Sequence, residues 1–316
     1  MERLTIPGTD LEVSQVCYGT AGLGTAVTGS AVDELLNTYR HHGGNFLDTA
    51  HCYGFWAPGG NGASERAIGE YLKRHPKDDL IVATKGGHPG RPGYRKTDRW
   101  LSRCRVQCDI DDSLGRLELD TIDLFWLHRD DTRMDVGEVI ETLNEEIRRG
   151  RIRYLGASNW TVERIEAANT YAEEKGLHGF VASQVEWSLA GKEPADRTGE
   201  HGDYTIYARE GEVAFHEHTG LPLVAYTATA RGYFAPDTEK RADFDNPVSR
   251  GRLERAEQLA EKLGVTANQV ALAWLMNQSF PAIPITGTHN AQHLRENMAA
   301  ADIDLTPEQV RWLANG

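Results

Sequence analysis

Short apolar runs alternate with amphipathic segments along most of the chain. Residues 2–14 alternate apolar and polar side chains around a Pro-Gly-Thr-Asp turn, which predicts a β-hairpin. Eight units follow, and in each a short apolar run precedes a segment with apolar residues at helical spacing. The predicted strands are residues 16–20, 46–49, 80–84, 122–127, 152–157, 181–185, 223–226 and 282–285. The predicted helices are residues 30–42, 64–75, 98–117, 136–149, 161–174, 207–218, 250–263, 267–277 and 291–300.

This alternation predicts an α/β protein, a closed (β/α)8 TIM barrel with an N-terminal β-hairpin. No break in composition separates the units, so we expect residues 1–316 to form a single domain. A doubly wound open sheet is the alternative. It would require a Gly-x-Gly-x-x-Gly turn after the first strand, and the glycines between Gly19 and Gly24 do not have that spacing.

The amino-acid composition bears on whether the chain binds nucleic acids or membranes and on its cellular compartment. The chain is 40% hydrophobic and 26% charged, with a formal net charge of -13, and it has no basic stripe that could neutralise phosphates. The N-terminus lacks an apolar leader, and the longest apolar run, residues 270–276, is too short to cross a bilayer. The four cysteines form no CxxC pair, which is typical of a reducing compartment. We therefore expect a cytoplasmic protein with no nucleic-acid or membrane partner.

Four titratable side chains follow three of the predicted strands. Asp48, Lys85 and His128 each end an apolar run, and Tyr53 comes five residues after Asp48. Alone, each has an ordinary explanation, such as a helix cap, a solvated lysine or a satisfied core histidine. In a barrel of parallel strands, however, all C-terminal strand ends meet on one face. An acid, a phenol, an ammonium and an imidazole at one mouth indicate a functional site.

The motifs around these residues resemble those of the aldo-keto reductase family, which are (β/α)8 nicotinamide-dependent oxidoreductases. Asp48 lies in Asn-Phe-Leu-Asp-Thr-Ala, Tyr53 in His-Cys-Tyr-Gly, Lys85 in Ala-Thr-Lys-Gly-Gly and His128 in Trp-Leu-His-Arg. The resemblance covers essentially the whole chain. It implies an NAD(P)-dependent enzyme that reduces an aldehyde, ketone or sugar-like carbonyl to an alcohol. Tyr53 would be the general acid, activated by the charge of Lys85, with Asp48 orienting Lys85 and His128 binding the substrate oxygen.

The family's cofactor-binding segments also have counterparts here. They are Gly-Ala-Ser-Asn at 156–159, Ser-Gln-Val-Glu-Trp at 183–187 and Leu-Arg-Glu-Asn at 294–297. The residues that the resemblance assigns to NADP(H) or NAD(H) are Ser158, Asn159, Gln184, Trp187, Gly287, Thr288, His289, Glu296 and Asn297. Trp187 is expected to stack on the nicotinamide ring. The 2′-phosphate of NADP(H) is usually bound by a basic residue in this family, and Asn290 stands in its place here. Because a neutral side chain cannot bind that phosphate as an Arg does, we expect appreciable use of NAD(H).

Substrate contacts are expected from a Gly-rich loop at residues 55–63, which follows Tyr53. Its two adjacent aromatic residues, Phe55 and Trp56, are predicted to form a substrate wall. Residues 190–206 are interpreted as a flap over cofactor or substrate, or as a solvated excursion. A polyhydroxylated substrate is suggested by a mixture of apolar and polar candidates, namely Trp100, Trp160, Tyr233, His51, His88, Arg129 and Asp130.

Two other function classes were considered. A non-catalytic nucleotide-binding regulatory subunit of the same fold is opposed by the intact set of four titratable residues. A metal-dependent TIM-barrel lyase or isomerase would use Asp48, His51, His88 and His128 as ligands, and the Lys85 ammonium would repel its cation. We therefore expect an enzyme without a metal, acting on a small-molecule carbonyl as a monomer or weak homo-oligomer.

Overall fold

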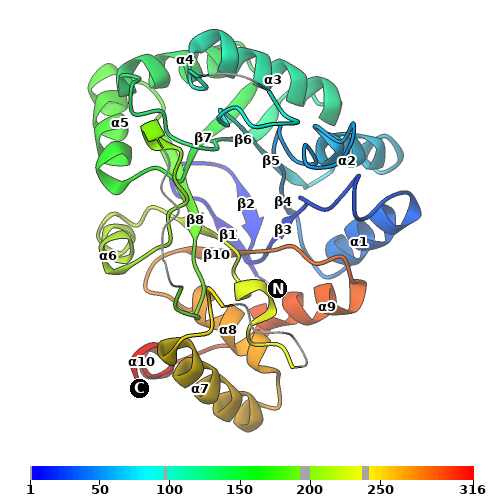
Figure 1. The fold of residues 1–316 in the computed structure, drawn as a ribbon, viewed down its shortest axis with the longest axis vertical. Helices are drawn as coiled ribbons and strands as arrows, with labels where there is room; N and C mark the ends of the chain where they lie inside the picture. Colours follow the sequence, from blue (N-terminus) through cyan, green and yellow to red (C-terminus); the bar gives the residue numbers. More distant parts are fainter. Residues whose placement is uncertain (1, 96–97, 193–199, 237–241) are drawn as a thin grey trace.

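A closed barrel of eight parallel strands forms the centre of the molecule (Figure 1). The computed structural model describes residues 2–95, 98–192, 200–236 and 242–316. The strands follow one another around the barrel in the order β10-β3-β4-β5-β6-β7-β8-β9. They are β3 (Cys17–Gly19), β4 (Phe46–Asp48), β5 (Ile81–Gly86), β6 (Ile122–Leu127), β7 (Ile152–Ser158), β8 (Phe180–Glu186), β9 (Leu223–Tyr226) and β10 (Ala282–Thr286). The predicted barrel is confirmed, and the open sheet is excluded.

The predicted N-terminal hairpin is also present. Strands β1 (Arg3–Thr5) and β2 (Glu12–Ser14) pair antiparallel. Asn45, the residue before β4, ties the hairpin to the barrel: its Oδ1 accepts from the Ser14 amide at 2.7 Å, and its Nδ2 donates to the Glu12 carbonyl at 2.8 Å. Because these bonds lie at the start of β4, the hairpin covers the N-terminal ends of the strands. The opposite face is left for the site.

Helices surround the barrel (Figure 1). Those that alternate with the strands up to β9 are α1 (Ser30–His41), α2 (Ala63–Arg74), α3 (Arg103–Leu117), α4 (Val136–Arg148), α5 (Val162–Lys175) and α6 (Glu210–Thr219). The C-terminal part adds α7 (Pro247–Leu263), α8 (Ala267–Met276), α9 (Ala291–Ala299) and α10 (Pro307–Asn315). Their buried faces are apolar, as the helical spacing predicts; in α4 these residues include Val139, Ile140 and Leu143.

Four helices differ from the prediction, and one of them, α7, begins three residues early, at Pro247, because Asn246 caps it. Another, α3, begins at Arg103 because the preceding residues form turns in which the Trp100 Nε1 donates to the Asp130 carbonyl at 2.8 Å. Likewise, α6 begins at Glu210 because the chain before it pairs with β8, through the Ala208 amide and the Glu186 carbonyl. The sequence prediction missed α10, although it begins with a capping box of Thr306 and Gln309. None of these differences alters the barrel.

Among the described helices, none is long and apolar enough to cross a membrane. The predicted flap at 190–206 lies partly outside the described residues, which omit 193–199. Its last residue is held at the barrel rim, since the Ile206 amide donates to the Asn159 Oδ1 at 3.0 Å. The flap role itself stays a prediction.

Candidate active site

A cavity of about 470 Å³ lies at the C-terminal ends of the strands. Its wall brings together most of the residues singled out in the sequence. These are Asp48, Tyr53, Phe55, Trp56, Lys85, His128, Ser158, Asn159, Gln184 and Gly287. Because they come from six strand ends, only the closed barrel makes them neighbours.

Lys85 stands at the centre of the polar contacts. Its Nζ makes an ion pair with Asp48 and donates to the Thr49 carbonyl at 2.8 Å and to the Tyr53 hydroxyl at 3.2 Å. The second Asp48 oxygen accepts from the Gln184 Nε2 at 3.0 Å. Lys85 is only 1% exposed, so these partners replace water. The ammonium is therefore fixed beside the Tyr53 hydroxyl.

Burial and charge act in opposite directions on this pair. Desolvation by itself would lower the pKa of Lys85, but the Asp48 carboxylate raises it above its usual value. Desolvation raises the pKa of Tyr53, and this outweighs the lowering by Lys85. Lys85 thus lowers the pKa of Tyr53 as expected, but the desolvation of the phenol has the larger effect. Tyr53 is a protonated phenol at neutral pH, and Lys85 limits the rise.

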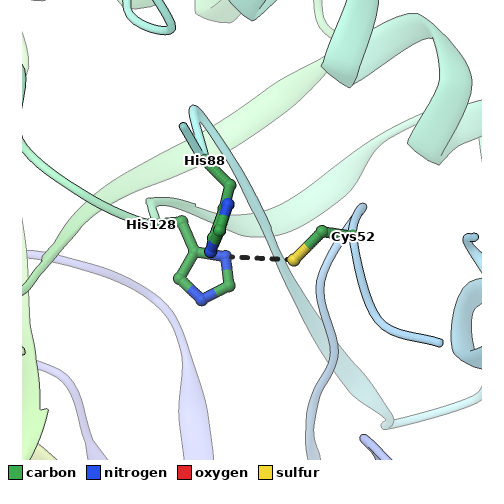
Figure 2. Close-up of side chains that lie close together, drawn as sticks. All are labelled: Cys52, His88 and His128. Atoms are coloured by element: carbon green, nitrogen blue, oxygen red, sulfur yellow. Dashed lines mark hydrogen bonds between the residues drawn. The ribbon is translucent and has the colours of Figure 1, made fainter. Parts of the chain in front are cut away.

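His128 faces Tyr53 edge to face, with ring centroids 6.0 Å apart and an interplanar angle of 80°. Burial, followed by the charge of Arg129, lowers the pKa of His128 well below its usual value, so the ring is neutral. Its Nδ1 lies 3.6 Å from the Cys52 Sγ (Figure 2). Burial raises the pKa of Cys52 to about 12, so Cys52 is a thiol, and its S–H group can donate to this nitrogen. In that arrangement the proton of the neutral ring resides on Nε2.

Amide and hydroxyl groups line the opposite side of the cavity. Asn159 has a positive φ of 56°, and its Oδ1 accepts from the Tyr226 hydroxyl at 2.8 Å. The Asn159 Nδ2 donates to the Ser158 Oγ at 2.9 Å. Tyr226, which the sequence reasoning missed, lines the cavity at the end of β9. Its position as the last residue of a predicted strand was the available signal.

Trp187 is not part of the cavity lining, and its predicted stacking role is corrected. Its ring packs against Trp274 with a centroid distance of 5.0 Å and against Phe280 at 5.9 Å. Gln184 of β8 lines the cavity, whereas Trp187, the residue after β8, packs against Trp274 of α8. On this side of the cavity the lining includes the aromatic ring of Tyr226.

A second hollow continues from the cavity toward α9. The two share Thr229, Arg231 and Gly287 in their walls. The second hollow is also lined by four predicted cofactor residues, Thr288, His289, Glu296 and Asn297. Together the two hollows form a continuous groove from the His128 side of the barrel to the start of α9. Such a groove suits an extended ligand.

Side-chain contacts within the second hollow limit what its residues can bind. The Asn290 Oδ1 accepts from the Gln292 and His293 amides, so Asn290 caps α9. Arg231, which the sequence reasoning missed because no motif marks the loop after β9, is exposed and makes no hydrogen bond or ion pair among the described residues. A Cβ added to Gly287 would meet only the Gly19 carbonyl, at 3.5 Å. Within the described part of the chain, the groove thus offers a cation without a partner, Arg231, and an open backbone at Gly287.

Phe55 and Trp56 form an aromatic rim. Trp56 is 55% exposed, and its ring lies 6.2 Å from that of Tyr53. The Phe55 ring lies 5.8 Å from Tyr94 and 6.3 Å from His88. Both side chains line the cavity, where a substrate wall was predicted.

Most of the other predicted substrate contacts lie elsewhere. Of those candidates only His88 and Arg129 line the cavity. Asp130 is bound by Arg164, with Nε and Oδ2 2.8 Å apart. Trp100, Trp160 and Tyr233 are buried away from it. The polar mixture that suggested a sugar-like substrate is therefore not assembled at the cavity.

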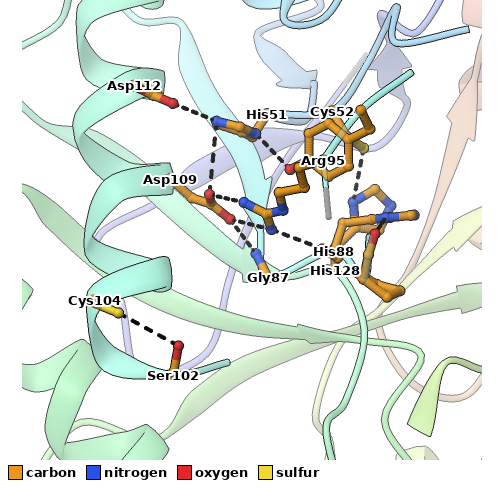
Figure 3. A network of polar contacts seen from close by, with 12 residues as sticks. His51, Cys52, Gly87, His88, Arg95, Ser102, Cys104, Asp109, Asp112 and His128 are labelled. Atoms are coloured by element: carbon orange, nitrogen blue, oxygen red, sulfur yellow. Dashed lines mark hydrogen bonds and ion pairs between the residues drawn. The ribbon is translucent and has the colours of Figure 1, made fainter. Parts of the chain in front are cut away.

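His51 takes part in a network behind the cavity rather than in its wall (Figure 3). Its Nδ1 contacts the Tyr94 hydroxyl at 2.8 Å, and its Nε2 contacts the Asp112 Oδ2 at 3.0 Å. In the same network, Asp109 of α3 accepts from the Gly87 amide at 2.8 Å and pairs with Arg95. The network holds the loop after β5 in place.

The chain is similar in sequence and fold to several known proteins. The model of the Aldo/keto reductase family matches residues 15–315. Aldo-keto reductase ausK of Aspergillus calidoustus is 30% identical, over 98% of this chain and 80% of its own. An aryl-alcohol dehydrogenase of Pestalotiopsis microspora is 27% identical, over 99% of this chain and 81% of its own. A crystal structure of a thermostable aldo-keto reductase with the inhibitor epalrestat has a similar fold, with a TM-score of 0.75, 24% identity and 99% of both chains covered.

Proposed function

The chain belongs to the aldo/keto reductase family, oxidoreductases that act on carbonyl compounds, and from this premise we propose that it reduces an aromatic aldehyde or ketone to the alcohol with NADPH or NADH. The observation that carries the proposal is the contact of Tyr53 with Lys85, whose other bonds go to Asp48 and Thr49. In this arrangement the Tyr53 hydroxyl is the proton donor, and the Lys85 ammonium stabilises the phenolate that forms when the proton leaves.

The groove fits a dinucleotide. Ser158, Asn159 and Gln184 supply polar groups at the cavity end, where they would hold the carboxamide of a nicotinamide. The Tyr226 ring supplies a flat face beside them, and the Arg231 guanidinium supplies positive charge for phosphate. When bound, the nicotinamide supplies the hydride. The protein's part is to orient the carbonyl and to provide the proton.

Proton transfer follows from the contacts of Tyr53. As negative charge develops on the carbonyl oxygen, the Tyr53 hydroxyl donates its proton to that oxygen. Lys85, 3.2 Å away, stabilises the phenolate that remains, and Asp48 keeps Lys85 charged. The His128 Nε2–H donates a hydrogen bond to the same oxygen and orients the carbonyl. In alcohol oxidation the steps reverse, with the phenolate as base.

The aromatic rim supports an aromatic substrate. Phe55, Trp56 and Tyr53 present rings to the cavity, and such rings bind planar apolar groups by stacking and edge contacts. The name of one relative, an aryl-alcohol dehydrogenase, points to the same class. A sugar would need several hydrogen-bonding side chains, and of the predicted ones only His88 and Arg129 line the cavity.

Use of NADH is part of the proposal. Asn290 is neutral and its side-chain oxygen is occupied by the cap of α9, so it cannot act as a basic clamp for a 2′-phosphate. Arg231 would bind phosphate common to both cofactors. His289, Glu296 and Asn297 would contact the adenosine end.

The test is titration of the protein with NADPH and with NADH, followed by nicotinamide fluorescence, and then a panel of aromatic aldehydes, aliphatic aldehydes and sugars. Binding of either nucleotide and turnover of aromatic carbonyls are expected. Failure to bind both would contradict the proposal. Binding without turnover would favour the regulatory-subunit alternative instead.

The proposal also includes the domain organisation, cellular location and oligomeric state of the enzyme. We infer one domain over residues 1–316, a cytoplasmic location, and a monomer or weak homo-oligomer. Light scattering after size exclusion measures the assembly. A tight oligomer at micromolar concentration would contradict that part alone.

A further inference from the structure

Cys52, His88 and His128 bring a thiol and two imidazoles to one side of the cavity (Figure 2). They follow three neighbouring strands, β4, β5 and β6, and all three line the cavity. Their candidate ligand atoms lie within 4.8 Å of one another. We propose that these residues bind a soft divalent ion such as Zn²⁺ or Co²⁺, and that the bound ion inhibits the enzyme. The ion is an inhibitor here, not a cofactor.

His88 is oriented as a ligand. Its Nδ1 lies 2.8 Å from the Pro89 carbonyl oxygen, so this nitrogen carries the proton and donates it. The lone pair is then on Nε2. The Arg95 Nη2 donates to the His88 carbonyl at 2.8 Å, and Asp109 holds Arg95 (Figure 3). Metal-binding histidines are commonly fixed in this way through the nitrogen that does not bind the metal.

Cys52 and His128 already have nearly the separation that a shared ion requires. At Zn–S and Zn–N bond lengths of about 2.3 and 2.0 Å, tetrahedral ligands lie about 3.4 to 3.6 Å apart. The Cys52 Sγ and the His128 Nδ1 are 3.6 Å apart. On binding, the Cys52 S–H bond breaks, its proton leaves to solvent, and a sulfur–metal bond forms without any change in oxidation state. The ion replaces the thiol proton between the two residues.

The location explains inhibition. The three ligands line the same cavity as Tyr53. The fourth coordination position of the ion would therefore face the space where the substrate carbonyl is proposed to bind. Binding would also place a cation near Lys85, which the Cys52 thiolate partly offsets. His88 and His128 were also candidate ligands of the metal enzyme considered from the sequence, but its other two ligands are engaged elsewhere. Asp48 is held by Lys85, and His51 by Tyr94 and Asp112.

Co²⁺ gives a readout that needs no turnover, because a bound thiolate produces a charge-transfer absorption band. The parent for all measurements is Cys104→Ser/Cys108→Ser, which removes the two exposed thiols. We expect this parent to bind about one Co²⁺ per chain with that band. Cys52→Ala in the same background should lose the band. His88→Gln should weaken Co²⁺ binding at least about tenfold, with the circular dichroism and melting temperature of the parent retained.

Absence of the band in the parent, or an undiminished band in Cys52→Ala, overturns the site. Inhibition rests on the proposed function and is measured separately. Zn²⁺ should raise the apparent KM for the carbonyl at least about tenfold and leave the Kd of the nucleotide within about twofold, and EDTA should reverse the effect. Equal inhibition of Cys52→Ala would overturn the inhibitory role. If the parent shows the band but never turns over a carbonyl, the metal site stands and the proposed function fails.

Discussion

The ammonium nitrogen of Lys85 lies 3.2 Å from the hydroxyl oxygen of Tyr53. The remaining bonds of this ammonium go to the Asp48 carboxylate and the Thr49 carbonyl, so its position does not depend on a bound ligand. A buried cation with a fixed position stabilises a phenolate at one place only. The predictions below test what that arrangement does.

Tyr53→Phe removes the proposed proton donor and keeps the ring. We expect kcat for carbonyl reduction to fall by about 10²- to 10⁴-fold, the usual range for a positioned acid. The Kd of the nucleotide, measured by fluorescence, should stay within about twofold because the Tyr53 hydroxyl is not assigned to the cofactor. Retention of kcat within tenfold would show that another group donates the proton.

Lys85→Met should destabilise the protein as well as inactivate it. It leaves the buried Asp48 carboxylate without its cation, and breaking a buried pair in this way costs about 3–5 kcal/mol of unfolding free energy. The double variant Asp48→Asn/Lys85→Met removes both charges, so we expect part of that loss to be recovered while kcat stays low. Denaturant unfolding measures the first quantity. Full additivity of the two substitutions would contradict the pairing.

The pH profile should show no histidine ionisation near neutrality. The pKa of His128 is lowered well below its usual value, so its neutral form persists at all higher pH values. The pKa of Tyr53 is raised, so the phenol is present below that raised value and is lost only as the pH rises through it. We expect kcat/KM for reduction to be flat from about pH 6 to about pH 9. An inflection near the ordinary histidine pKa that disappears in His128→Gln would contradict this.

Trp56→Ala should impair binding of aromatic substrates selectively. An aromatic contact contributes about 0.5–1.5 kcal/mol, so KM for an aryl aldehyde should rise about 2- to 13-fold. KM for a small aliphatic aldehyde is the internal control and should not change. Because Trp56 is 55% exposed, the melting temperature should also hold. Equal effects on both substrates would place Trp56 outside the substrate wall.

Cofactor choice tests the adenosine end of the groove. We expect kcat/KM for NADPH and NADH to differ by less than ~100-fold, since a larger ratio requires about 2.7 kcal/mol of discrimination. Arg231→Gln should weaken both nucleotides by a similar factor, because its proposed ligand is phosphate common to both. A selective loss of NADPH binding would instead assign Arg231 to the 2′-phosphate.

The barrel and the four residues at its mouth could be predicted because their signals are local. Each strand is a short apolar run that ends in a turn, and parallel strands place every such end on one face. Asp48, Lys85 and His128 therefore had to share a mouth once the eight units were recognised. The missed α10 also had a local signal in Thr306 and Gln309.

The direction of individual side chains was decided by the tertiary structure. Trp187 follows β8 and Tyr226 ends β9, but the Trp187 ring packs against Trp274 away from the cavity, whereas the Tyr226 hydroxyl binds Asn159 within it. The pKa of Tyr53 likewise depends on how much water the surrounding chain removes, which no motif encodes.

The sequence by itself determined the fold, the family resemblance and which residues reach the barrel mouth, because these follow from hydrophobic periodicity and strand ends. Only the tertiary structure decided that Cys52 contacts His128, that His51 turns to Asp112 and that Arg231 joins two hollows. Those relationships join residues on different strands and loops. Their geometry arises when the barrel closes and the side chains pack, which is a property of the whole chain rather than of any segment.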